Sequence, residues 1–164
     1  MMKKTLSSAH GACAVVIAAV LLATASSSFA DDMKLPPLKR QKTAQGDVDE
    51  HLDALNKCDW NRLMAQYPPQ VEIHLPDGVI VKGRQKVGEL FAGFCKTRAD
   101  KGLKGLKFTT QTSFPVGGTL NVMWHADADF LAETYKGSDA YVTKDGLMYA
   151  QVTTFDGSKL KFKP

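Results

Sequence analysis

Histidines spaced two residues from an acid are the first candidates for chemistry in this sequence. His125 and Asp127 lie two residues apart in an alternating segment, so their side chains project from the same face of a strand. Together with His74 they would offer the imidazole and carboxylate ligands that zinc accepts. The apolar residues that alternate with them turn all three side chains outward, and the spacing brings no third ligand to the pair. We therefore expect no metal. The sequence also lacks a Gly-rich phosphate loop and a Ser elbow, so we expect no cofactor.

The first thirty residues have the layout of a secretory signal. Lys3 and Lys4 precede an apolar run over residues 13–24, and small residues lead to Ala30, after which we expect cleavage. The run is short for a membrane span, which leaves a retained N-terminal anchor as the alternative. No aliphatic residue stands where a lipoprotein signal needs one, so we expect no lipid anchor. The prediction is a periplasmic or secreted protein that leaves the membrane after signal cleavage.

Two cysteines, Cys58 and Cys95, remain after the signal. An oxidising compartment and an even number of cysteines favour a disulfide, and the spacing fits no zinc pattern. Free thiols stay an alternative, because the sequence does not show whether the two α-carbons approach closely enough to be bridged. A nucleophilic cysteine is a further alternative, which oxidation outside the cell disfavours.

The remaining 134 residues, 31–164, amount to about one domain. The whole chain carries a formal charge of +4, and removing Lys3 and Lys4 of the signal leaves +2. This charge is too small to indicate nucleic-acid binding, and the lysines are scattered along the chain. We expect them to form solvated surface, and we expect no nucleic-acid partner.

The order of the predicted elements indicates an α+β fold. After a linker over residues 31–46, Asp47 and Glu50 have the spacing of a capping box that opens a first helix. Asp59 caps a second, short helix, 60–66, and a third helix is expected over 84–96. The strands are predicted at 71–75, 79–81, 106–114, 120–128, 134–143 and 148–155. Helices that come first and a meander that comes last predict a curved antiparallel sheet with its helices on one face.

Two stretches of the chain resemble a known family. Residues 58–91, CDWNRLMAQYPPQVEIHLPDGVIVKGRQKVGELF, resemble the opening of SnoaL-like domains of the nuclear-transport-factor-2-like superfamily. Residues 137–156, GSDAYVTKDGLMYAQVTTFD, resemble the closing hairpin of these domains. The resemblance assigns residues 47–164 to such a domain, with three N-terminal helices and a bent sheet that form a cone around a pocket. The family includes steroid isomerases, polyketide cyclases, epoxide hydrolases and dehydratases, as well as non-catalytic binding modules, so the fold alone does not decide the activity.

The resemblance implies a catalytic pair, His51 and Asp139. Asp139 matches the pocket acid of ketosteroid-isomerase-like members, and His51 falls where those members place a tyrosine that contacts the substrate oxygen. Leu75 stands where they carry the general-base carboxylate, which excludes their mechanism with that base. A buried Asp139 would orient the imidazole of His51, which would then move a proton next to a carbonyl or activate a water. Alternation along the strands and the resemblance place the ligand-binding residues at Leu55, Leu75, Trp124, Tyr141, Gln151, Thr153 and Phe155.

Less specific interpretations stay open for the same residues. His51 can be a solvated helix residue, and Asp139 a structural acid that binds backbone groups. Apolarity alone would turn Ala140 and Val142 inward on the fifth strand, which is the opposite of what the resemblance implies. The protein is thus expected to bind a small, mostly apolar molecule, either as an isomerase, cyclase or hydrolase or as a binding module without turnover. A third hypothesis is an interaction protein whose outer sheet face, with His74, His125 and Asp127, forms a homodimer.

Overall fold

The computed structural model describes residues 33–164 and contains three α-helices and six strands in that range. The predicted secretory signal lies outside the described residues. The helices are α1 (Ala44–Lys57), α2 (Trp60–Ala65) and α3 (Arg84–Phe94). The strands are β1 (Glu72–His74), β2 (Ile80–Lys82), β3 (Lys107–Val116), β4 (Thr119–Asp127), β5 (Tyr135–Lys144) and β6 (Leu147–Thr154), followed by a short 3₁₀ turn, Gly157–Lys159. None of the described helices is long and apolar enough to cross a membrane.

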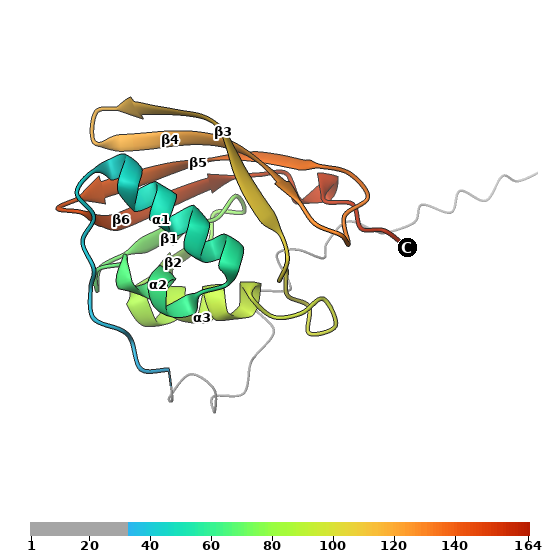
Figure 1. The fold of residues 1–164 in the computed structure, drawn as a ribbon, viewed down its shortest axis with the longest axis horizontal. Coiled ribbons are helices and arrows are strands. Elements are labelled where there is room, and N and C mark those ends of the chain that lie inside the picture. The colour runs from blue at the N-terminus through green and yellow to red at the C-terminus, as the bar shows by residue number, and fades with distance from the viewer. Residues whose placement is uncertain (1–32) are drawn as a thin grey trace, which may run out of the picture.

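The six strands form one curved, open sheet in the order β2-β1-β6-β5-β4-β3. All neighbours are antiparallel except β1 and β6, which run parallel. The three helices lie on the concave side of the sheet, with α1 under the long strands β3 to β6 (Figure 1). This is the predicted α+β arrangement of a bent sheet with its helices on one face.

The start of α1 differs from the prediction. The N-cap is Thr43, whose side-chain oxygen accepts a hydrogen bond of 3.0 Å from the backbone N–H of Gly46. The helix therefore begins at Ala44, and the predicted linker is shorter by three residues. Asp47 does not cap the helix but lies inside it, fully buried. The Thr43 hydroxyl thus takes the capping role that was expected of the Asp47 carboxylate, and it satisfies one of the free N–H groups of the first turn. At α2 the expected cap is confirmed, because the Asp59 carboxylate accepts from the N–H of Arg62 at 3.1 Å.

The strand faces follow the predicted alternation. Val71 and Ile73 point into the core, and on β4 the Trp124 side chain lies on the inner face and is 3% exposed. On β5 the resemblance is correct and apolarity alone is wrong, because Asp139 and Tyr141 are buried whereas Val142 is exposed. The concave face of a six-stranded sheet therefore carries a carboxylate and a phenol at its centre.

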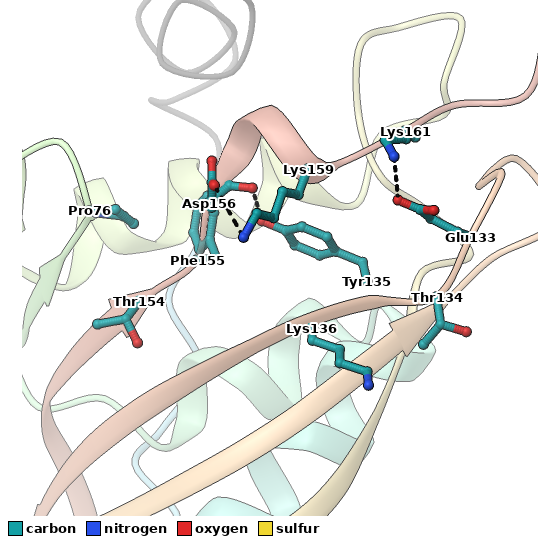
Figure 2. A pocket seen from close by; sticks show the side chains of 10 residues that line it. All are labelled: Pro76, Glu133, Thr134, Tyr135, Lys136, Thr154, Phe155, Asp156, Lys159 and Lys161. Carbon is teal, nitrogen blue, oxygen red and sulfur yellow. Dashed lines mark hydrogen bonds and ion pairs between the residues drawn. The ribbon is translucent and has the colours of Figure 1, made fainter.

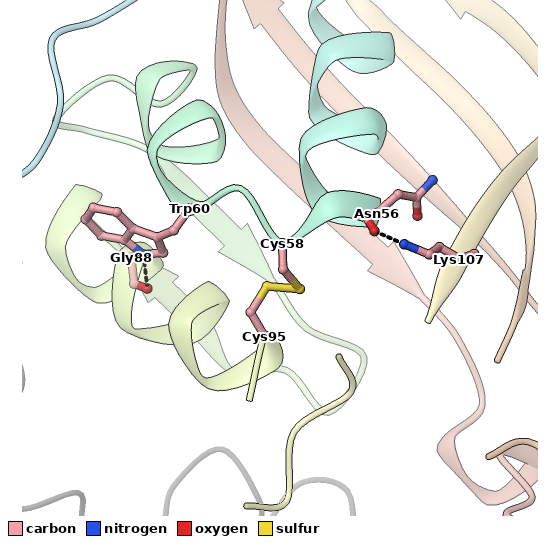
Figure 3. Close-up of a disulfide and its surroundings, with 6 residues drawn as sticks. All are labelled: Asn56, Cys58, Trp60, Gly88, Cys95 and Lys107. Carbon is pink, nitrogen blue, oxygen red and sulfur yellow. Dashed lines mark hydrogen bonds between the residues drawn. A yellow bond between two sulfur atoms is a disulfide. The ribbon is translucent and has the colours of Figure 1, made fainter. Parts of the chain in front are cut away.

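Cys58 and Cys95 form a disulfide, as the cysteine count predicted (Figure 3). Their α-carbons are 5.5 Å apart, within the normal range for a bridge. Cys58 ends α1 and Cys95 ends α3, so the bond ties together two helices that are separated in sequence. Beside it, the indole N–H of Trp60 donates to the carbonyl of Gly88 at 2.9 Å, which fixes α2 on α3.

Candidate functional site

A cluster of buried polar side chains lies between α1 and the concave face of the sheet. Asp47 and His51 come from α1, Tyr67 from the connection between α2 and β1, and Asp139 and Tyr141 from β5. His51, Tyr67 and Tyr141 are fully buried, and Asp139 is 8% exposed. Buried polar groups normally find partners within the protein, so the atoms that lack one are of particular interest.

Asp139 is held by two donors from the sheet. Its Oδ2 atom accepts hydrogen bonds of 2.9 Å from the indole N–H of Trp124 and from the hydroxyl of Tyr141. Burial raises the pKa of Asp139 to about 6, and the hydrogen bonds from Tyr141 and Trp124 oppose this rise. The carboxyl is therefore mostly ionised at neutral pH but can accept a proton. Its second oxygen, Oδ1, is buried and has no partner among the described residues.

A glycine on the neighbouring strand makes room for this arrangement. Gly137 is paired with Trp124 across β4 and β5, and a Cβ atom at Gly137 would lie 2.4 Å from the indole ring. Only glycine leaves the space for the indole to lie across β5 and direct its N–H at Asp139. The role of Gly137 could not be predicted from the sequence, because it depends on the register between β4 and β5.

His51 is buried and neutral. Its Nδ1 atom lies 3.1 Å from the hydroxyl of Tyr67, and its Nε2 atom has no partner among the described residues. Burial lowers the pKa of His51 to about 4, because charging the imidazole in the core would remove the ion from water. The alternative of a solvated surface histidine is therefore wrong.

The direct contact between His51 and Asp139 that the resemblance implied is not formed. The hydrogen-bond partner of His51 is Tyr67, and the partners of Asp139 come from the sheet. Tyr141 connects the two residues instead: its ring lies 5.6 Å from the imidazole, and its hydroxyl binds the carboxylate. The carboxylate thus belongs to the sheet and does not orient the imidazole. The catalytic roles themselves stay a prediction.

Asp47 is the residue that sequence reasoning missed. It lies one helical turn before His51, is 0% exposed, and neither of its carboxylate oxygens has a partner among the described residues. Burial raises its pKa to about 7. The spacing of Asp47, His51 and Leu55 at intervals of four would have placed the acid on the buried face of α1, but the capping pattern favoured a surface position.

The other residues expected to bind a ligand surround this cluster. Leu55, Gln151 and Thr153 are buried, and Leu75 and Phe155 are partly buried and pack against the core. Gln151 pairs with Tyr141 and Thr153 with Asp139 across β5 and β6. The Gln151 and Thr153 side-chain oxygens have no partner among the described residues, so the concave face carries several buried polar atoms whose hydrogen-bonding capacity is unused.

A large cavity lies at one end of the sheet rather than over the polar cluster. It has a volume of about 780 Å³ and is lined by residues of β5, β6 and the C-terminal tail (Figure 2). Tyr135 and Phe155 form its inner wall, and the Tyr135 ring lies 5.9 Å from the ring of Trp124. Two aromatic side chains therefore separate the cavity from the Trp124–Asp139 pair.

The residues considered for metal binding do not form a metal site. His74 pairs with Glu72 at 3.1 Å, and His125 pairs with Asp127 at 3.5 Å. Within residues 33–164 no three histidine, cysteine, aspartate or glutamate side chains come together in a way that could hold an ion.

Comparisons with known proteins agree with this architecture. Residues 48–157 match the SnoaL-like domain family, and no curated protein sequence matches. A protein from Kribbella flavida described as a ketosteroid isomerase is 18% identical and superposes with a TM-score of 0.53. The match covers 72% of this chain and 78% of that protein. A protein from Sinorhizobium meliloti described as a polyketide cyclase is 16% identical and superposes with a TM-score of 0.54. The match covers 66% of this chain and 93% of that protein.

A computationally designed binder of 17-OHP has the same fold. It is 18% identical, with 73% of this chain and 95% of the binder covered and a TM-score of 0.58. At these identities the structural likeness establishes the fold and not the activity. The family match spans most of the chain, and the helices and the curved sheet agree with it. This chain belongs to the SnoaL-like domain family, with the cone fold of NTF2-like proteins.

Proposed function

We propose that this protein binds a small, mostly apolar molecule on the concave face of its sheet and catalyses a proton transfer there. One observation supports the proposal above all others. Asp139 Oδ1 and His51 Nε2 are buried polar atoms without a partner among the described residues, and most of the side chains packed in this core are aromatic or aliphatic. A binding site of this kind uses apolar surface for affinity and a few polar atoms for orientation.

The protonation states assign the roles in this proposal. Asp139 is ionised at neutral pH and accepts a proton, since its raised pKa makes it a stronger base than an exposed carboxylate. His51 stays neutral and forms a hydrogen bond with a ligand oxygen through Nε2. The tautomer is set by Tyr67: if the Tyr67 hydroxyl donates to Nδ1, then Nε2 carries the proton and donates to the ligand. This division of roles suits the abstraction of a proton next to a carbonyl.

The experiment starts from the ligand that the protein carries. Small molecules that co-purify from the native host are identified by mass spectrometry and returned to the protein in D₂O. Deuterium should enter the ligand with wild-type protein and not with the isosteric Asp139→Asn variant. The control is Asp129→Asn, an exposed acid in the loop after β4, which should keep the exchange. A bound ligand without exchange in the wild type would favour a binding module without turnover, and the absence of any bound small molecule would contradict the proposal.

The disulfide supports the proposal that the protein acts outside the cytoplasm. A bridge between Cys58 and Cys95 is compatible with an oxidising compartment. Cell fractionation of the native host, with detection of the processed N-terminus at Asp31, tests export. Unprocessed protein in the cytoplasm would contradict it.

A second candidate function is self-association through the outer face of the sheet. One row of residues crosses all six strands there, and its members are Phe114, Asn121, Ala140, Val152, His74 and Ile80. Phe114 and the neighbouring Met123 are about half exposed, at 48% and 52%, and both line a hollow of about 230 Å³. The central strands carry no charged side chain in this row, so a second copy could cover it without burying an ion.

The dimer proposal is tested by mass measurement in solution. Wild-type protein should sediment as a dimer, and Met123→Glu should sediment as a monomer because the new carboxylate would have to be buried. Asn61→Glu, on the exposed side of α2, is the matched control and should stay dimeric. A wild-type protein that is monomeric at all concentrations would remove this candidate.

A further inference from the structure

The large cavity lies where β5 and β6 diverge. Ser138 and Thr154 form the last pair of the two strands, and the chain then turns away into the C-terminal tail, residues 157–164. The tail folds back on the loop before β5, where Leu131 and Phe162 form a bridge. The diverging strands and the tail enclose the cleft of about 780 Å³ (Figure 2). It is larger than the hollow of about 230 Å³ on the outer face.

The inner wall of the cleft is aromatic. Tyr135 and Phe155 lie edge to face with their centroids 6.4 Å apart, and the hydroxyl of Tyr135 donates to the carbonyl of Asp156 at 2.9 Å. This hydrogen bond turns the polar end of Tyr135 toward the tail and leaves the ring as wall (Figure 2). Pro76 adds apolar surface to the lining. Ring systems stack favourably on such a wall.

The rim of the cleft carries lysine amines that are not fully neutralised. Lys161 pairs with Glu133 at 2.9 Å. The Oδ1 atom of Asp156 accepts from the backbone N–H and the hydroxyl of Ser158, and its Oδ2 atom forms a long ion pair of 3.7 Å with Lys159. Lys136 forms no ion pair within residues 33–164. Lys136 is therefore available to an anion, and Lys159 is held only by a long, exposed ion pair that an anion could share.

The segment packed behind the tail adds to the positive charge. Arg98 lies against the rings of Phe130 and Phe162, at 5.5 and 4.0 Å from their centroids, and so anchors the tail. The loop that supplies Arg98, residues 95–106, also carries three lysines and only one acid, Asp100. A cleft with an aromatic wall and a positive surround concentrates anions near its mouth.

We infer that this cleft binds an organic anion, an apolar ring system that carries a carboxylate or a sulfonate. The rings lie on Tyr135 and Phe155, and the acidic group lies at Lys136 and Lys159. The inference goes beyond the proposed function and does not rest on it, because Tyr135 and Phe155 separate this cleft from Asp139. The ligand of this cleft is therefore an aromatic or polycyclic acid rather than a neutral hydrocarbon-like molecule.

Two dyes of nearly the same shape test the inference. 8-Anilinonaphthalene-1-sulfonate carries an anionic group, and N-phenyl-1-naphthylamine is its uncharged counterpart. Both are titrated by fluorescence against wild-type protein and against the Lys136→Gln/Lys159→Gln double variant. The matched control is Lys86→Gln/Lys144→Gln, which removes the same charge from exposed sites on α3 and at the far end of β5.

The expected result is specific to the charge of the dye. The double variant at the cleft should bind the sulfonate about fivefold more weakly, as expected for two solvent-exposed ion pairs, and should bind the neutral dye as the wild type does. The control variant should bind both dyes as the wild type does. In wild-type protein, raising the salt concentration should weaken the binding of the sulfonate and leave the binding of the neutral dye unchanged. Equal affinity for the two dyes in the wild type, or the same loss in both double variants, would overturn the inference.

The result is independent of the catalytic proposal. Asp139→Asn should keep the charge-dependent binding of the sulfonate, because the carboxylate lies behind the aromatic wall. If this variant and the wild type both bind the dye but no deuterium exchange occurs, the proton transfer fails and the anion site stands. If exchange depends on Asp139 but the lysine variants bind the sulfonate normally, the anion site fails and the proton transfer stands.

Discussion

Replacing Asp47 by asparagine should make the stability of this protein less dependent on pH. The carboxyl group of Asp47 is fully buried in α1, and both of its oxygens lack a partner among the described residues. Burial raises its pKa from 3.8 to about 7, because the charged form loses its hydration without gaining a hydrogen bond. The neutral acid is therefore the form that the folded state prefers.

The sign and the size of the effect follow from this shift. The folded-state pKa lies above the unfolded value, so the contribution to stability is complete below pH 3.8 and is lost as the pH rises through 7. With one pKa unit equal to roughly 1.4 kcal/mol, the full loss amounts to about 4 kcal/mol. Nearly all of it falls between pH 4 and pH 8. Asparagine has the same shape and no charge, so the Asp47→Asn variant should not show this loss.

Urea unfolding followed by tryptophan fluorescence at five pH values from 4 to 8 measures the effect. The quantity of interest is the difference in unfolding free energy between the variant and the wild type, since other titrating groups are common to both proteins. This difference should rise with pH in favour of the variant. Val48→Ala, at the neighbouring fully buried position, is the control and should give a difference that does not change with pH. A flat difference for Asp47→Asn as well would refute the conclusion that the carboxyl is buried without a partner.

Three further predictions concern the disulfide, a helix cap and the site acid. Replacing Cys58 and Cys95 together by serine should lower the unfolding free energy by about 4 kcal/mol, which is the loop-closure value for a separation of 37 residues. Urea unfolding with and without reductant measures this loss, and an unchanged midpoint of the urea transition would contradict the prediction. Asp59→Ala should cost about 1 kcal/mol through loss of the α2 cap, and Asp59→Ser should restore most of this stability. Tyr141→Phe removes one donor from Asp139, so the pKa of this carboxyl should rise further above its ordinary value. Carbon-detected NMR titration of the side-chain carboxyl measures this shift, and a fall in the pKa would contradict the assigned hydrogen bond.

The order of the elements and the orientation of most strands can be predicted from the sequence. Alternation placed Trp124 on the inner face of β4, and the family resemblance placed Asp139 on the inner face of β5. The Asp59 cap also followed from local pattern, and the even number of cysteines favoured the disulfide without deciding it. These features are accessible because side-chain direction in a strand and the first turn of a helix depend on a few consecutive residues.

The tertiary structure alone decided which polar groups meet in the interior. His51 was expected to contact Asp139, but Tyr67, from the connection after α2, occupies its Nδ1 side. Asp47 was assigned to a helix cap, but the packing of α1 under the sheet buries it. The direction of the Trp124 indole depends on Gly137 in the neighbouring strand. Each of these contacts joins segments that are distant in sequence. The contacts depend on how α1 crosses the sheet and on the register of the strands, and the periodicity of a single segment predicts neither the crossing nor the register.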